Sequence, residues 1–112
     1  MKSRDDVISH SMTGSVVELK GYISTSHELK LYDSKRSLGS TRNCISGVYG
    51  DGANPAYYRL LDTRLVHIKA VLAEYREGII IGANQALGSR SLATFENHCG
   101  RDTVFILVGE LR

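Results

Sequence analysis

Long apolar runs are missing from this chain of 112 residues. The longest, Gly78–Ala83, falls far short of the roughly 20 residues that a membrane-spanning helix needs, so the sequence excludes a transmembrane segment. The apolar stretch of a secretory signal is also missing, since Lys2 and Arg4 are followed directly by Asp5 and Asp6. We therefore expect a cytoplasmic protein, unless a leader has been removed.

Cysteine is scarce as well. Cys44 and Cys99 lie far apart in the sequence and lack the C-x-x-C spacing of zinc and redox sites. We expect two buried reduced thiols, because an unpaired cysteine packs like a small hydrophobic residue. A disulfide is the alternative, and it would point to an oxidising compartment. The 4 histidines show neither H-x-x-x-H nor H-E-x-x-H spacing, so we expect no metal site and no cofactor.

Sequence motifs of catalysis are absent. There is no G-x-S-x-G, and the glycines of Gly47–Gly52 are not followed by the lysine of a phosphate-binding loop. Ser26, His27 and Glu28 are consecutive, so they cannot hydrogen-bond to one another as a nucleophile, a base and an orienting acid must. We therefore expect a protein that is not an enzyme.

Charge of one sign is not in large excess, because 14 Lys and Arg against 12 Asp and Glu leave a net charge of +2. Domains that bind nucleic acid are usually more basic than this. The hydrophobic share of 42% is that of an ordinary globular protein, and the length suits one domain. We expect residues 1–13 to form a flexible arm and residues 14–112 to form a single domain.

Alternation of apolar and polar residues is the dominant pattern. In Ser15–Thr25 the residues Val17, Leu19 and Ile23 alternate with polar ones, which predicts a half-buried strand, and Gly21 suggests a bend or bulge in it. Further strands are predicted in His27–Tyr32, Cys44–Tyr49 and Arg64–Tyr75, and Thr103–Leu111 is predicted as a strand that is apolar on both faces. Ile79–Ile81, after a turn at residues 76–78, is a short run that is apolar on both faces. The longest predicted connections are Asp33–Asn43, an exposed loop, and Gly82–Arg101.

One short helix is predicted, because Asn54 can cap a helix that begins at Pro55, the single proline. Tyr57, Leu60 and Leu61 share one face of this helix, which we expect to plug one end of a barrel. Three strands precede the helix and two follow it, which is the order of the elements in an OB barrel. We predict a mainly β fold, an OB-like five-stranded barrel with one short helix between strands 3 and 4.

Four segments of the chain carry a family resemblance. Leu19–Ile23, Leu31–Ser34, Cys44–Ser46 and Arg64–Leu72 together resemble small bacterial OB-like proteins of uncharacterised function. The resemblance covers roughly residues 16–72, and it departs from the family pattern at Ala70, where such strands often carry glycine. It implies the fold and supplies no catalytic residue.

Binding is thus the expected mode of action, with a protein as the favoured partner. The partner could be a bacterial toxin that this chain neutralises as an immunity protein, with Tyr49, Tyr57 or Tyr58 as hot spots. The alternative is single-stranded nucleic acid, held by aromatic and basic side chains on the outside of the barrel. The candidate binding residues are Lys20, Tyr22, Lys30, Tyr32, Lys35, Arg36, Arg42 and Tyr49.

Overall fold

The computed structural model describes residues 14–26, 28–76, 79–81 and 97–110, so the predicted arm and most of the predicted connection 82–101 lie outside the described residues. These residues form a mainly β structure whose elements agree closely with the predicted strands. The elements are β1 (Val16–Ser24), β2 (Leu29–Tyr32), the 3-10 turn η1 (Lys35–Ser37), β3 (Cys44–Tyr49), α2 (Pro55–Arg59), β4 (Leu65–Arg76), β5 (Ile79–Ile81) and β6 (Thr103–Glu110). No helix among them is long and apolar enough to cross a membrane.

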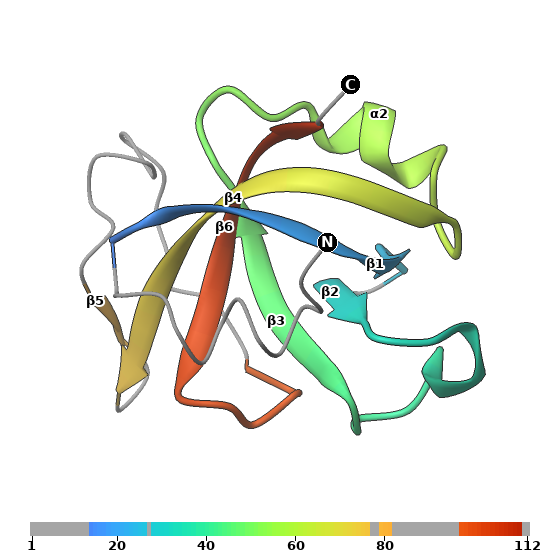
Figure 1. Cartoon of the computed structure of the whole chain (residues 1–112), viewed down its shortest axis with the longest axis horizontal. Helices are drawn as coiled ribbons and strands as arrows, with labels where there is room; N and C mark the ends of the chain where they lie inside the picture. The colour runs from blue at the N-terminus through green and yellow to red at the C-terminus, as the bar shows by residue number, and fades with distance from the viewer. Residues whose placement is uncertain (1–13, 27, 77–78, 82–96, 111–112) are drawn as a thin grey trace.

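The sheet closes on itself in a ring (Figure 1). Its strands follow the order β1-β2-β3-β6-β4-β5, and β1 also pairs with β4 along Val16–Tyr22. β3 and β6 run parallel, whereas the other pairs are antiparallel. Five strands make the ring as expected, and β5 adds a sixth, because the chain turns after Arg76 and pairs Ile79 back against it.

The main core lies inside the ring and follows from the alternation of each strand. Since every second side chain of a strand points to the same face, one apolar set per strand meets the others at the centre. These buried residues are Val17, Leu19 and Ile23 of β1, Leu29 and Leu31 of β2, Ile45 of β3, Val66, Ile68, Ala70 and Leu72 of β4, and Phe105 and Leu107 of β6.

Two glycines let backbone and side chains come close together in this core. A Cβ on Gly21 would lie 2.5 Å from the carbonyl oxygen of Tyr32, so β1 approaches β2 more closely there than a side chain permits. The pairing of β1 with β4 runs through Gly21 without a register shift, so close approach explains this glycine and the suggested bulge is wrong. A Cβ on Gly47 would lie 2.4 Å from the ring of Phe105, which occupies that space.

A second buried cluster lies on the outer face of β4 and β6. It consists of Val71, Ala73, Ile80, Val104 and Ile106. Because Val104 and Ile106 alternate with Phe105 and Leu107 of the main core, β6 is buried on both faces. This agrees with a sequence that is apolar at every one of these positions.

The helix is shorter than predicted and its buried face is different. α2 begins at Pro55, and the side chain of Asn54 accepts a hydrogen bond from the amide of Ala56 at 3.0 Å, so the predicted cap is confirmed. The predicted apolar face is wrong at two of its three residues, because the helix ends at Arg59, Leu60 is its C-cap with 76% of its surface exposed, and Tyr57 is 43% exposed. Leu61 is half-buried and packs against the core as predicted, and Tyr58 lies in the core as well.

Candidate binding surface

Two of the predicted binding residues are covered. Tyr32 lies on the outer side of β2, as the alternation predicts, but its exposed fraction is 0%, because its hydroxyl donates to the carbonyl oxygen of Ser40 in the β2–β3 connection. It cannot serve as an exposed stacking platform, so this part of the prediction is wrong. Burial raises the pKa of the Tyr32 hydroxyl above its ordinary value, more than a hydrogen bond from the backbone of Gly39 lowers it.

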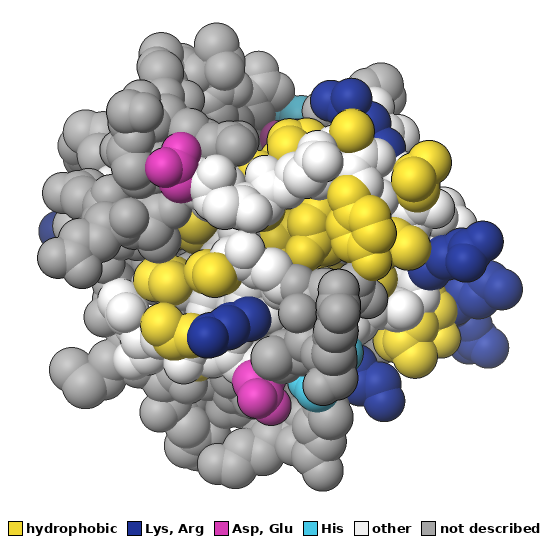
Figure 2. Space-filling view, turned by 90° about the horizontal axis from the view of Figure 1, so that it is seen from above, with side chains coloured by type: hydrophobic (Ala, Val, Ile, Leu, Met, Phe, Trp, Pro, Cys, Tyr) yellow, Lys and Arg dark blue, Asp and Glu magenta, His cyan; other side chains and the backbone are white. Residues whose placement is uncertain are grey.

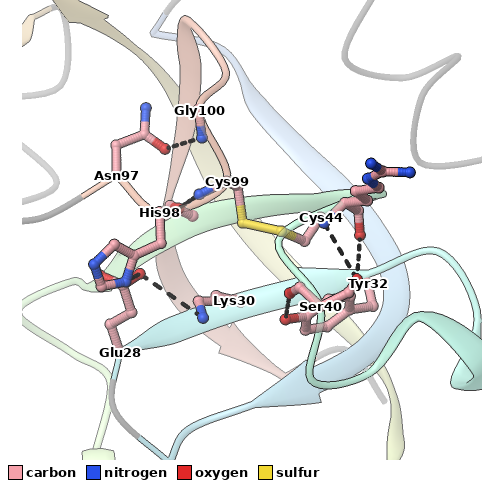
Figure 3. A network of polar contacts seen from close by, with 11 residues as sticks. Glu28, Lys30, Tyr32, Ser40, Cys44, Asn97, His98, Cys99 and Gly100 are labelled. Carbon is pink, nitrogen blue, oxygen red and sulfur yellow. Dashed lines mark hydrogen bonds and ion pairs between the residues drawn. A yellow bond between two sulfur atoms is a disulfide. The ribbon is translucent and has the colours of Figure 1, made fainter.

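Lys30, next to it on β2, is covered by a turn formed by residues 97–100 (Figure 3). Its side chain is only 15% exposed, and it lies 4.0 Å from Glu28, whose carboxylate also pairs with His98 of the turn at 2.5 Å. The 97–100 turn is bonded to β3 by a disulfide between Cys99 and Cys44. The expectation of two reduced thiols is therefore wrong.

Lys20 and Tyr22 point outward from β1, as predicted. Lys20 is exposed and lies opposite His67 of β4, while the half-buried Tyr22 lies opposite Leu65. Glu18 belongs to the same face and approaches His67 to 3.7 Å. This face therefore carries both signs of charge, not the uniformly basic surface that nucleic acid favours.

Lys35, Arg36 and Arg42 are exposed in the connection between β2 and β3, where the sequence predicted an exposed loop. Serine side chains fold this connection back on itself, for example through the Ser40 hydroxyl, which donates to the carbonyl of Ser37 at 2.8 Å. The three cations belong to one loop, and the predicted sheet residues nearest to it in the sequence, Lys30 and Tyr32, are covered.

Tyr49 belongs to a row of three tyrosines at the end of the ring that carries α2. Its ring centroid lies 6.0 Å from that of the buried Tyr58, which in turn lies 5.1 Å from that of Tyr57 in an edge-to-face contact. Burial raises the pKa of Tyr49, against the opposing effect of the nearby Arg59. The row runs from the core at Tyr58 to the surface at Tyr57, which is 43% exposed.

The largest exposed apolar side chains near this row define what we call the α2–β4 surface. It consists of Tyr57, Leu60 and Leu65, which are 43%, 76% and 51% exposed, flanked by the exposed Arg59 and Arg64. Figure 2 looks onto the end of the molecule that carries α2 and shows hydrophobic side chains gathered near the middle, with most of the visible Lys and Arg side chains toward the right-hand edge.

Local hydrogen bonds explain why these residues share one end of the molecule. The amide of Arg64 donates to the carbonyl of Leu61 at 2.9 Å, which closes a tight turn between α2 and β4. The carboxylate of Asp62 accepts from the amide of Thr25 at 2.7 Å and ties this turn to the end of β1. The turn is therefore fixed on both sides, and Leu60 and Leu65 flank it.

Leu60 and Leu65 were not predicted as binding residues. Leu60 was assigned to the core by helical spacing, although a five-residue helix is too short to keep positions i, i+3 and i+4 on one buried face. Leu65 occupies a position that alternates with the buried Val66 and Ile68, so the pattern that predicted β4 already placed it outward. An outward leucine at the start of a strand was the available signal.

Within the described ranges, no group of three His, Cys, Asp or Glu side chains could hold a metal ion. Ser26 and Glu28 are described and His27 is not, so the consecutive Ser-His-Glu run is outside what the structure tests. No protein-family model, curated protein or solved structure matches this chain, so its function has to be inferred from the surface itself.

Proposed function

We propose that this chain is an OB-like β-barrel domain that binds one protein partner stoichiometrically through its α2–β4 surface, without catalysis. The barrel assignment is supported by a ring of five strands in which β3 and β6 are parallel and the helix falls between β3 and β4. These features support the proposal, since an OB fold is a five-stranded Greek-key barrel.

The exposure of Leu60 carries the proposal. Scattered apolar side chains are common on protein surfaces, but neighbouring exposed ones with a polar rim mark interaction sites. Here a leucine that is 76% exposed accompanies Leu65 and Tyr57, and arginines flank them. Tyrosine and arginine are among the residues enriched at binding hot spots, and the ring of Tyr57 contacts that of Tyr58.

A nucleic-acid partner is less well supported. Single-stranded nucleic acid needs exposed aromatic rings beside a continuous basic groove. Tyr32 is buried, Tyr22 is half-buried, and the face that holds Lys20 also carries Glu18. Among the described residues, the predicted stacking residues Tyr22 and Tyr32 therefore give the basic loop around Arg36 little aromatic surface.

The disulfide bears on where such binding would take place. Disulfides persist in oxidising compartments and are rare in the cytoplasm. The Cys44–Cys99 bond therefore favours an oxidising location. It argues against the cytoplasmic location predicted from the sequence, which stays a prediction. An immunity protein against a toxin is one form that the proposed activity would take, with the toxin occupying the α2–β4 surface.

Affinity capture with matched variants tests the proposal. Tagged wild-type chain, Leu60→Asp and Val16→Asp are each incubated with lysate of the source cells, with and without nuclease, and bound proteins are identified by mass spectrometry. Val16 is a suitable control because it is also exposed (58%) but lies far from the α2–β4 surface. It is six residues along β1 from Tyr22, the partner of Leu65 in the sheet, which is roughly 20 Å at 3.3 Å per residue.

We expect one protein to be retained in near-equal molar amount by the wild type and by Val16→Asp, to survive nuclease, and to be lost with Leu60→Asp. Equal retention by Leu60→Asp would remove the α2–β4 surface from the proposal. Loss of all bound material on nuclease treatment would favour the nucleic-acid alternative.

A further inference from the structure

The 97–100 turn lies across the outer face of β2 and β3, and Figure 3 shows how it is attached. Cys99 is half-buried and bonded to Cys44, which is 2% exposed at the start of β3. The amide of Cys99 also donates to the hydroxyl of Ser46 at 3.1 Å, and Ser46 is fully buried beneath the turn. One covalent bond and one hydrogen bond thus hold the same residue against β3.

Polar groups lie beneath this turn. Lys30 of β2 pairs with Ser46 of β3 in the sheet, and the side chains of Lys30 and Glu28 are only 15% and 16% exposed. His98 of the turn contacts the Glu28 carboxylate at 2.5 Å. Burying an ammonium and a carboxylate away from water is unfavourable unless they are paired, and here both Lys30 and His98 pair with Glu28. Lys30 and Glu28 would exchange part of this pairing for hydration if the turn moved away.

The turn joins β6 through Gly100 and Arg101, and the side chain of Asn97 accepts from the amide of Gly100 at 3.1 Å and donates to the carbonyl of Arg101 at 2.5 Å. Gly100 has a φ of +72°, and a Cβ there would meet nothing within 4 Å, so the backbone is open on that side. Two residues later the carbonyl of Asp102 accepts from the amide of Tyr75 at 2.6 Å, which fixes the start of β6 to β4. Movement of residues 97–99 therefore need not disturb the ring.

We propose that the Cys44–Cys99 disulfide is a redox-controlled latch that holds the 97–100 turn over the outer face of β2 and β3, and that its reduction uncovers this face. In the oxidised protein the turn occupies the face as a segment of the same chain. In the reduced protein Lys30 and Ser46 become accessible to solvent and to ligands. This latch is independent of the α2–β4 surface and of the partner proposed for it.

The reductant is a dithiol. One of its thiolates attacks the sulfur of Cys99, the more exposed of the two cysteines, and forms a mixed disulfide while Cys44 leaves as a thiolate and takes up a proton. The second thiol of the reductant then attacks the mixed disulfide and releases Cys99 as a thiol. Two electrons and two protons pass to the protein, and the dithiol ends as a cyclic disulfide.

Acetylation of lysines tests the latch. The full chain is treated with the acetyl ester of N-hydroxysuccinimide before and after reduction by dithiothreitol, and the rate at each lysine is read by peptide mass spectrometry. We expect the rate at Lys30 to rise at least fivefold on reduction. Lys20, exposed on β1, is the internal control, and its rate should change less than twofold.

Two variants separate the disulfide from its surroundings. Cys99→Ser should acetylate at Lys30 as fast as the reduced wild type, and its circular dichroism spectrum should stay that of the folded chain. Ser46→Ala loses the hydrogen bond but keeps the disulfide, so its Lys30 should react at the oxidised wild-type rate.

Four results would overturn the latch. They are a mass unchanged by reduction and alkylation, a Lys30 rate that does not respond to dithiothreitol, a Ser46→Ala variant that is already fast when oxidised, and a general loss of folded structure on reduction. The last result would make the bond a staple of the whole fold instead of a local latch.

Discussion

At Gly21, β1 passes too close to β2 for a side chain to fit. An added methyl group at Gly21 would lie 2.5 Å from a backbone oxygen and 2.9 Å from the side chain of Leu31, so a strand or a core leucine would have to move. We expect Gly21→Ala to lower the free energy of unfolding by about 2 kcal/mol, within the usual range for overpacking. Urea denaturation measures this, with Gly52→Ala as the control, because a Cβ at Gly52 meets nothing within 4 Å.

A Gly21→Ala variant as stable as the wild type would mean that β1 and β2 are farther apart than described. The sequence located this glycine on the inward face, but only the packing reveals that its reason is the approach of β2. The same limit applies to Gly47, whose place beneath the ring of Phe105 depends on a parallel pairing between distant segments.

Leu60 distinguishes the observed helix from the predicted one. Leu60→Ala should change the free energy of unfolding by less than about 0.5 kcal/mol, because a side chain that is 76% exposed removes little apolar area from water. Leu31→Ala, at a fully buried position, should cost about 3 kcal/mol in the same denaturation experiment. A cost at Leu60 similar to that at Leu31 would restore the predicted apolar helix face.

Tyr32 makes the folded chain sensitive to high pH. Its pKa in the folded state is raised above the ordinary value by burial, so the unfolded chain loses this proton at a lower pH than the folded chain does. The contribution of the Tyr32 hydroxyl to the free energy of unfolding is complete below the pKa of about 10 that it has in the unfolded chain. This contribution is lost as the pH rises through the pKa of the folded state. Urea denaturation between pH 8 and 12 should show stability falling above about pH 10, less steeply in Tyr32→Phe. An equal slope in both proteins would contradict the burial of this hydroxyl.

At the scale of elements, α2 depends on its N-cap. Because the Asn54 side chain accepts from the Ala56 amide, Asn54→Ala should lower the free energy of unfolding by about 1 kcal/mol. Asn54→Asp retains a capping oxygen and should stay within about 0.5 kcal/mol of the wild type. Thermal denaturation of the two variants checks this, and equal melting temperatures would show that the cap does not stabilise the helix.

The strands were predictable from the sequence, but the loops that cover their outward side chains were not. Period-two alternation identified β1 and β4 almost to their ends, because one face of each strand must be buried and the register follows from that face. Tyr32 shows the limit, since alternation assigns a side chain to the outside of the ring without revealing what lies over it. Its cover comes from the Ser40 loop, and that of Lys30 from the distant Cys99 turn, neither of which leaves a periodic signal.

At the scale of the whole molecule, the β2–β3 face and the end that carries α2 differ in what they offer a partner. The β2–β3 face is covered by the chain's own 97–100 turn, which the disulfide holds in place. The α2 end carries an exposed leucine and tyrosine among described residues, flanked by arginines. Binding by the oxidised protein is therefore expected at the α2 end. The pairing of the two cysteines, which holds the turn on the β2–β3 face, could not be predicted from their spacing in the sequence.

Calorimetric titration of the captured partner against wild-type chain, Leu60→Asp and Val16→Asp tests the α2–β4 surface most directly. We predict one-to-one binding to the wild type and to Val16→Asp with similar Kd, and a Kd at least tenfold higher for Leu60→Asp, since that variant places a charge where leucine would be buried. A Kd unchanged by Leu60→Asp would contradict the proposed surface.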